Sequence, residues 1–523
     1  MWDNIVQAPE KTRPGIEPLP RDQQGKEILS VARGGGIVFV GTVATRVLSY
    51  IYSLVLIRSL GAESFGQFTL ALAILLFVSP LSTIGLSQGI VRYGAFYGFS
   101  HGMTGIHQVT MAAIRLVVPV SFLLMFVFIC SASGIADLVF HKDELKTIIR
   151  ILAFSIPFMS LQSLLLAATR SLKLMRYSTI VWIVQPLIAM FLVIVLIYRG
   201  LNVEAAAVAY VVSFICSAVL ALYFYLRLIP YKDRRGEHFP IGPMLKFSIP
   251  LSMTEWIHFT NERTEIFFLG LLPGSVNISI YKISWSLAGL ERMLRLSLEQ
   301  ILAPFSSDLS RRREIKQLEA LYKATAKWGF TVALLIFLIY LLFGREIMGF
   351  FDPSLVLGAG ILVALSFAQL FNEFTGPCNT ILSMSGRSDL TFLNTVILFV
   401  TSIALDWFLI PTYGLRGAAI AGAATIIFVN ILRVVEVWIT MRIHPFKWST
   451  YKSVLAGLLS TALVFLLRVY VYSGPFLVDI FYMLVFCIAY FALILILRLD
   501  AEDRIVIDTV KAKILAFRTR QAT

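Results

Sequence analysis

Charged residues are scarce in this sequence. Asp, Glu, Lys and Arg together make up 15% of its 523 residues, whereas 58% are hydrophobic, and the mean hydropathy is +0.81. A soluble domain does not need so much apolar sequence to fill its core, so the scarcity of charge excludes an ordinary soluble protein. The sequence predicts an integral membrane protein that crosses the bilayer many times as helices.

Cysteine and histidine are also rare. The four cysteines lie in or beside apolar segments without paired spacing, which excludes a disulfide framework and a cysteine metal site: Cys130, Cys216, Cys378 and Cys487. The six histidines are not spaced with carboxylates as metal ligands are, and no glycine-rich phosphate loop follows a strand. We therefore expect a transporter rather than an enzyme, with no metal site and no cofactor.

What the sequence has instead is a series of long apolar runs. At about twenty apolar residues per crossing, these runs predict about fourteen transmembrane helices. Lys and Arg gather in alternate loops, for example at 232–235 and 311–316, and the other loops hold scattered single charges. Because basic loops stay in the cytoplasm, both termini are expected there, in a cell (cytoplasmic or inner) membrane. The net charge of +14 then reflects orientation, and we expect no nucleic-acid partner.

The two halves of the chain repeat each other at a shift of 213 residues. Residues 60–68 (LGAESFGQF) then overlie 273–281 (PGSVNISIY), and 177–198 overlie 390–411 without a gap. Six predicted helices shift onto six, so both halves begin on the same side of the membrane, which defines a parallel repeat with a binding site expected at the interface. The expected fold class is therefore all-α and polytopic, with two six-helix lobes and two extra helices.

This organisation divides the chain into six segments. They are a polar cytoplasmic leader (1–34), an N-lobe (35–228), a cytoplasmic linker (229–245), a C-lobe (246–441), two further membrane helices (451–498) and a cytoplasmic amphipathic tail (499–523). The tail mixes apolar with basic residues, which is typical of a helix that lies on a membrane surface.

Two predicted helices, over 247–271 and 277–305, carry more charge than membrane spans normally tolerate. Helical spacing puts most of these charges on one stripe of each helix: Glu255, Glu262 and Glu265 with Arg263 at the edge on the first, and Arg292, Arg295 and Glu299 on the second. A charge near the bilayer centre costs a few kcal/mol on insertion scales. Both helices are therefore expected to face a polar cavity.

The first half of the chain has uncharged residues at the matching positions. The shift of 213 places Thr42 and Ser49 on two of the acids. Arg46, on the same face, is expected to face the charged helices across the lobe interface. Glu373 lies at mid-depth in a later helix, and whether it lines the cavity is left open. Asp406 lies near the end of its predicted helix and is expected to be solvated at the membrane interface.

Three segments carry a family resemblance. They are 36–93 with LIRSLGAESFGQFTLALAI, 280–310 with YKISWSLAGLERMLRLSLEQILAPFSSDLS, and 406–425 with DWFLIPTYGLRGAAIAGAAT. Together they resemble the polysaccharide transporter family, the Wzx-type oligosaccharide flippases of the MOP superfamily. The resemblance implies two six-helix lobes in a V, a cationic central cavity, and translocation of a polyprenyl-diphosphate-linked oligosaccharide across the lipid bilayer. Partners would be the glycan polymerase or glycosyltransferases of the same pathway.

On this resemblance, basic residues are expected to bind the diphosphate: Arg46, Arg292, Arg295, Lys282 and Arg263. A guanidinium group presents a fork of donors that matches phosphate oxygens. Acidic residues are expected to line the cavity or to bind a proton or sodium ion that drives alternating access: Glu255, Glu262, Glu265 and Glu373. These acids depart from a plainly cationic cavity.

Three other functions stay open. A peptidoglycan-precursor flippase would use the same architecture, and only the phenotype of depletion separates it. A MATE-like exporter of cations or drugs would need acids without competing arginines in its cavity. A membrane enzyme of glycan assembly commonly needs a sizeable outer loop, whereas the loops opposite the basic side are short. The sequence identifies neither the sugar nor the carrier lipid, undecaprenyl or dolichyl.

Overall fold

The structure of the chain is a computed structural model. It describes residues 21–172, 174–200, 202–229, 239–470 and 476–497, and every regular element within these ranges is a helix. The predicted all-α class is therefore confirmed. The predicted amphipathic tail, most of the predicted leader and part of the predicted linker lie outside the described residues.

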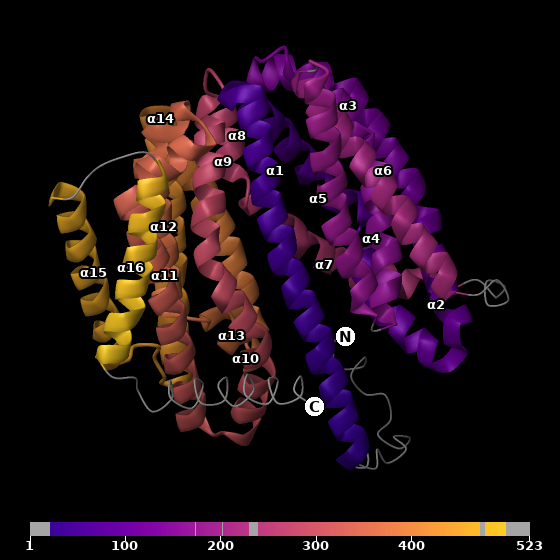
Figure 1. Cartoon of the computed structure of the whole chain (residues 1–523). Coiled ribbons are helices and arrows are strands. Elements are labelled where there is room, and N and C mark those ends of the chain that lie inside the picture. Colours follow the sequence, from indigo (N-terminus) through magenta and orange to yellow (C-terminus); the bar gives the residue numbers. More distant parts are fainter. Residues whose placement is uncertain (1–20, 173, 201, 230–238, 471–475, 498–523) are drawn as a thin grey trace, which may run out of the picture.

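The first half of the chain forms one bundle, which we call the N-lobe. Its elements are α1 (Arg21–Thr83), α2 (Leu86–Gly134), η2 (Ile135–Phe140), α3 (Leu145–Ala153), α4 (Ser155–Ser171), α5 (Met175–Tyr198) and α6 (Val203–Leu228). Helix α2 packs against α4, and α5 packs against α6 and α1. In Figure 1, α2 to α6 stand together on the right, and α1 runs along the side that faces the other bundle.

The second half forms the C-lobe, on the left in Figure 1. Its elements are α7 (Ile241–Asn261), α8 (Thr264–Gly270), α9 (Val276–Ala288), η4 (Gly289–Glu291), α10 (Arg292–Arg312), α11 (Ile315–Phe351), η5 (Pro353–Gly358), α12 (Ala359–Thr375), α13 (Cys378–Met384) and α14 (Ser388–Met441). After η6 (Trp448–Thr450), α15 (Tyr451–Tyr470) and α16 (Phe476–Ile496) pack against α11. The lobes meet mainly where α1 packs against α9 and α2 against α7.

Several of the longest helices contain a turn at a glycine. Gly61 in α1, Gly102 in α2 and Gly414 in α14 have φ of 78°, 61° and 57°, a conformation that glycine adopts without strain. A Cβ on Gly417 would lie 2.0 Å from the carbonyl oxygen of Leu409, so the chain folds back at Gly414. Nine helical stretches of the described ranges are long and apolar enough to cross a membrane. Because one stretch can contain such turns, the number of about fourteen crossings stays a prediction.

Two features of the structure agree with the shift of 213 residues. Helix α5 begins at Met175 and α14 begins at Ser388. In addition, a carboxylate oxygen of Glu63 accepts a hydrogen bond (3.1 Å) from the backbone N–H of Val276, its counterpart 213 residues further on. Equivalent positions of two lobes touch only near the axis that relates them. This axis therefore passes close to Glu63.

The distribution of polar and apolar side chains is that of a membrane protein. Glu291, Glu373 and Asp406 are 0% exposed, whereas Phe126 and Phe465 are 64% and 60% exposed. Apolar side chains on the outside meet lipid at no cost, while acids are kept inside the bundle. The chain is a multi-pass membrane protein whose ionisable interior groups need a purpose.

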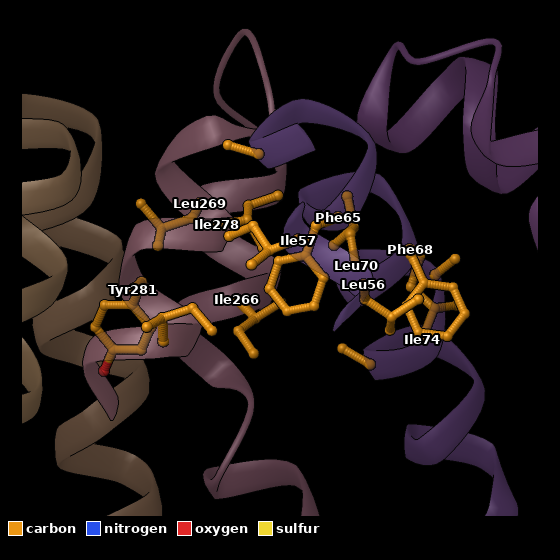
Figure 2. Packing of buried hydrophobic residues seen from close by; sticks show 14 of the residues in the cluster. Leu56, Ile57, Phe65, Phe68, Leu70, Ile74, Ile266, Leu269, Ile278 and Tyr281 are labelled. Carbon is orange, nitrogen blue, oxygen red and sulfur yellow. The ribbon is translucent and has the colours of Figure 1, made fainter. Parts of the chain in front are cut away.

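A shared apolar core joins the lobes at one end, which we call the distal end. Figure 2 shows Ile57, Phe65 and Leu70 of α1 beside Ile266 and Leu269 of α8. All five side chains belong to one buried cluster that draws on both lobes. Close packing of these side chains between the lobes leaves the distal end closed.

Candidate functional site

A polar cavity of about 510 Å³ lies between the lobes. Helix α1 forms one wall, and the chain from Glu262 to Arg292 forms the other. The polar side chains that line it are Thr42, Thr45, Arg46, Ser49, Tyr50, Ser53, Thr69, Trp182, Glu262, Arg263, Lys282, Trp285, Ser286 and Arg292. Trp182 of α5 carried no sequence signal, because it reaches the cavity only through the packing of α5 on α1.

Helical periodicity explains both walls. In α1 the lining positions recur every three or four residues from Thr42 onward, which is one face of a helix. The lining positions of α9 recur in the same way from Lys282. Tyr50 of α1 donates a hydrogen bond to the carbonyl oxygen of Ser286 in α9 (2.7 Å). The two walls are thus held against each other by a direct bond between the lobes.

The cavity is cationic. Glu262 is the single carboxylate among the lining residues that the structure describes, against four basic side chains. Arg263 lies 3.8 Å from that carboxylate and also donates to a backbone carbonyl oxygen of α7. Arg46, Lys282 and Arg292 have no ion-pair partner in the described part of the chain. Unmatched positive charge from both lobes suits a polyanionic ligand.

The structure separates the predicted site residues into two groups. All predicted diphosphate-binding residues except Arg295 line the cavity. Among the predicted acids, Glu262 lines the cavity, whereas Glu255, Glu265 and Glu373 lie elsewhere. The functional role of each of these residues stays a prediction.

Glu255 lies at a contact between the lobes. It accepts a hydrogen bond from the side-chain amide of Gln88 in α2 (3.0 Å). Close by, a Cβ on Gly85 would lie 2.4 Å from the carbonyl oxygen of Ser248, so α7 packs directly on the start of α2. The position of Glu255 suits the pairing of helices more than contact with a ligand in the cavity.

Glu265 shares a buried polar cluster with Asp406. The hydroxyls of Thr264 and Ser402 lie 2.9 Å apart; Thr264 donates to Glu265 (3.3 Å) and Ser402 to Asp406 (3.5 Å). Asp406 is 0% exposed, so the expected solvation at the membrane interface was wrong. Helix α14 packs against α8, and this contact, which the sequence does not reveal, brings the two carboxyl groups into one site.

Arg295 is bound inside the C-lobe. Its Nε donates to Glu373 of α12 at 2.8 Å, and a terminal nitrogen lies 3.4 Å from Glu299, one turn along α10. The sequence left open whether Glu373 lines the cavity. In the structure Glu373 lies away from the cavity, inside the C-lobe. Ser366 of α12 donates a short hydrogen bond to Glu291, a neighbouring acid.

Charged side chains of the N-lobe hold backbone groups of the C-lobe at the distal end. Arg58 donates to the carbonyl oxygen of Phe350 (2.5 and 3.0 Å) and stacks on its ring. Lys142 donates to the carbonyl oxygen of Gly274 (2.8 Å). Burial lowers the pKa of Lys142, against the opposing effect of Glu63. Together with Glu63, these side chains form a latch, which closes the cavity at this end.

Breaking the latch should open the distal end. In the double variant Arg58→Ala, Lys142→Ala we expect the open population to rise about tenfold, because bonds to charged groups contribute about 1.5–3 kcal/mol and solvent reduces this. Spin labels at the exposed positions Asp143 and Leu357 would report the distance between lobes.

Arg150→Ala is the matched control, because Arg150 donates to Ser133 within the N-lobe. An unchanged distance distribution in the double variant would contradict the latch.

Solved structures define the class of fold. The structure matches the lipid II flippase MurJ in an inward closed conformation with a TM-score of 0.72 and 15% identity, covering 87% of this chain and 98% of that one. It matches an inward-facing multidrug resistance MATE family transporter of the MOP superfamily with a TM-score of 0.67 and 15% identity, covering 76% and 94%. The fold is that of MOP-superfamily transporters.

The family follows from sequence. The family model described as polysaccharide biosynthesis protein matches residues 31–310, which is more than half of the chain, and the MatE model matches residues 250–408. The chain therefore belongs to the polysaccharide biosynthesis protein family, and the resemblance drawn from its sequence motifs is confirmed.

One curated relative is the probable flippase AglR of Haloferax volcanii. The two chains are 24% identical over 173 residues, which is 32% of this chain and 36% of the relative. The match thus spans about a third of the length of that relative.

Proposed function

We propose that this protein is a flippase that moves a polyprenyl-diphosphate-linked oligosaccharide across the membrane by alternating access. One observation carries the proposal. Arg46 approaches the cavity from the N-lobe, and Lys282 and Arg292 approach it from the C-lobe, all without carboxylate partners in the described residues. A ligand with several negative oxygens can accept charge-assisted hydrogen bonds from both sides at once.

The lining suggests how such a ligand would be held. Guanidinium groups bind phosphate oxygens in a bidentate manner, so Arg46 and Arg292 would grip the diphosphate from opposite lobes. Hydroxyl groups of α1, among them Thr45 and Ser49, would meet the sugar. A volume near 510 Å³ lies in the range of pockets for small ligands, about 300–1,000 Å³. It suits a diphosphate with its first sugars, while the prenyl tail stays in lipid.

Translocation would follow from rocking of the lobes about their contact at α1 and α9. The distal latch closes one end in this structure, so the cavity would exchange its ligand from the other end. The gradient of a proton or sodium ion that binds at Glu265 and Asp406 would supply the energy. The two carboxyl groups sit among hydroxyl oxygens, a set of ligands that suits a hard cation.

The setting of the protein is part of the same proposal. The basic loops favour both termini in the cytoplasm of a cell with a cytoplasmic membrane, so the ligand would be loaded there after glycosyltransferases have built it. A glycan polymerase would consume it on the other side. Translocation changes no covalent bond, which agrees with a transporter rather than an enzyme.

Two alternatives differ from this proposal in their substrates. The fold shared with MurJ favours a peptidoglycan-precursor flippase as the second candidate, and that substrate would also place negative oxygens in the cavity. A cation exporter is disfavoured by the charge of the cavity, because Arg46, Lys282 and Arg292 would repel its substrate.

Reconstitution tests the proposal directly. The full chain in phosphatidylethanolamine and phosphatidylglycerol liposomes should move radiolabelled undecaprenyl-diphosphate-linked chitobiose between leaflets. The measurement is the fraction of this lipid that can be digested from outside the liposome. The monophosphate-linked sugar should move at least about tenfold more slowly, since it loses charge-assisted hydrogen bonds of about 1.5–3 kcal/mol each.

The other substrates give the contradicting outcomes. Faster movement of lipid II than of the chitobiose lipid would favour the peptidoglycan-precursor alternative. Transport of tetraphenylphosphonium in place of either lipid would overturn the proposal.

A further inference from the structure

Arg295 points away from the cavity although its neighbour on α10 lines it. Arg292 and Arg295 are three residues apart, a spacing that puts two side chains on the same face of a helix. Arg292 lines the cavity, whereas Arg295 is held by Glu373 at 2.8 Å and Glu299 at 3.4 Å. The bond to Glu373, and not helical phase alone, keeps Arg295 inside the C-lobe.

Glu373 is an unusual partner, because only half of its carboxylate is satisfied. The side chain is 0% exposed, and its Oε2 has no hydrogen-bond partner in the described part of the chain. This oxygen rests against α11, where a Cβ on Gly329 would lie 2.7 Å from it. A buried carboxylate that loses its cation is strongly disfavoured and instead takes up a proton.

The charges around Glu373 come from few elements. Arg292, Arg295 and Glu299 of α10 act on it, and Glu291 of η4 is a further acid in reach. Helix α11 presents Gly329. Arg433 of α14 and Cys378 of α13 act on Arg295 rather than on Glu373. Removal of Arg295 therefore leaves acids as the main neighbours of Glu373 apart from Arg292.

We propose that Arg295 is shared between Glu373 and the diphosphate of the substrate, so that a proton on Glu373 releases Arg295 into the cavity. This inference rests on the proposed function. With Glu373 ionised, Arg295 stays in the C-lobe and the cavity binds the diphosphate through Arg46, Lys282 and Arg292. With Glu373 protonated, Arg295 turns toward Arg292 and adds its fork of donors. Protonation of Glu373 thereby raises the affinity of the cavity for the diphosphate, and bound diphosphate raises the proton affinity of Glu373 by the same factor.

The shared arginine explains two features together. The Oε2 atom of Glu373, which has no hydrogen-bond partner in the described residues, is the atom that can accept the proton. The shared arginine also explains why two arginines of one helical face are divided between two places: Arg292 and Arg295 repel each other unless a polyanion lies between them. The proton on Glu373 is returned when Arg295 leaves the departing substrate.

Equilibrium binding tests the inference without any ion gradient. The probe is undecaprenyl diphosphate, titrated into the full chain in nanodiscs at pH 6 and pH 8. Because the diphosphate itself titrates, the readout is each variant's affinity divided by that of the wild type at the same pH. Glu373→Gln should bind about tenfold tighter than wild type at pH 8, the effect of one further charge-assisted contact, and this ratio should be smaller at pH 6.

A second variant keeps every titratable group. Gly329→Ala would displace the Glu373 carboxylate from its seat and should bind more tightly at pH 8, in the same direction as Glu373→Gln. Arg295→Gln should remove the extra affinity from both backgrounds. Equal affinity of wild type, Glu373→Gln and Gly329→Ala at pH 8 would overturn the shared arginine.

Arg292→Ala distinguishes failure of the proposed function from failure of the shared arginine. If Arg292→Ala leaves the affinity for undecaprenyl diphosphate unchanged, the proposed function fails together with the inference. If Arg292→Ala weakens binding while Glu373→Gln and Gly329→Ala behave as wild type, only the shared arginine is wrong.

Discussion

Exchange of Arg46 and Arg292 for Gln should reduce flipping of a diphosphate-linked glycan by about a hundredfold or more. The two side chains reach the cavity from opposite lobes and have no carboxylate partners in the described residues. Charge-assisted hydrogen bonds contribute about 1.5–3 kcal/mol each, and 1.4 kcal/mol is a factor of ten. Loss of both arginines therefore removes the grip from each side of the ligand.

We expect the fold to tolerate the loss of both arginines. Arg46 and Arg292 form no ion pair in the described residues, and the buried carboxylate of Glu373 keeps its partner Arg295, so protein levels in the membrane should stay as in wild type. The rate is measured in liposomes with undecaprenyl-diphosphate-linked chitobiose. The single variants should each lose about tenfold, since the other lobe still holds the diphosphate.

Arg311→Gln is the matched control, because Arg311 lies on α10 together with Arg292. Arg311 lies at the far end of α10, is 81% exposed and pairs with Asp308, whose pKa this arginine lowers. This variant should flip the glycan lipid at the wild-type rate. A double variant of Arg46 and Arg292 that retained more than half of the wild-type rate would rule out the cavity as the diphosphate site.

The walls of the cavity were predictable from sequence because they depend on helical periodicity alone. Thr42, Arg46 and Ser49 share a face of any helix that contains them, and this face lines the cavity. Of their counterparts 213 residues further on, Glu262 also lines the cavity, whereas Glu255 lies at the contact with α2. No knowledge of packing is needed to see that such a face requires a polar neighbour. The lobe architecture followed from the same repeat.

The pairing of charged side chains inside the C-lobe was not predictable from helical periodicity. Arg295 shares a helical face with Arg292, yet its partner Glu373 comes from α12, 78 residues further on. Asp406 lies near the end of its predicted helix, so the sequence predicted a residue solvated at the membrane surface. Each finding depends on how α12 and α14 pack against the other helices of the lobe, and spacing along one helix contains no such information.

Asp406→Asn should abolish coupling of transport to an ion gradient while leaving exchange of substrate. The two carboxyl groups of Asp406 and Glu265 are buried together, and Oδ1 of Asp406 has no hydrogen-bond partner in the described residues. An amide at this position has no charge to bind a proton or sodium ion, although its shape is nearly that of the carboxyl group. The fold should therefore persist.

The size of the effect follows from the gradient. A tenfold ion gradient supplies about 1.4 kcal/mol per ion, enough for about tenfold accumulation of substrate at one ion per cycle. Wild-type liposomes with an imposed proton or sodium gradient should reach this ratio, and Asp406→Asn should remain near equal distribution. Running the two gradients separately identifies the ion.

Asp352→Asn provides the matched control for an acid changed to its amide. Asp352 is the N-cap residue of η5 and accepts hydrogen bonds from the backbone N–H and hydroxyl of Ser354, which an asparagine oxygen also accepts. Accumulation should stay at the wild-type ratio in this variant. If Asp406→Asn and Glu265→Gln both accumulate substrate as wild type does, the coupling ion binds elsewhere. Because the Glu373→Gln test is read at equilibrium without a gradient, that result would leave the shared arginine untouched and make Glu373 the next acid to test for coupling to protons.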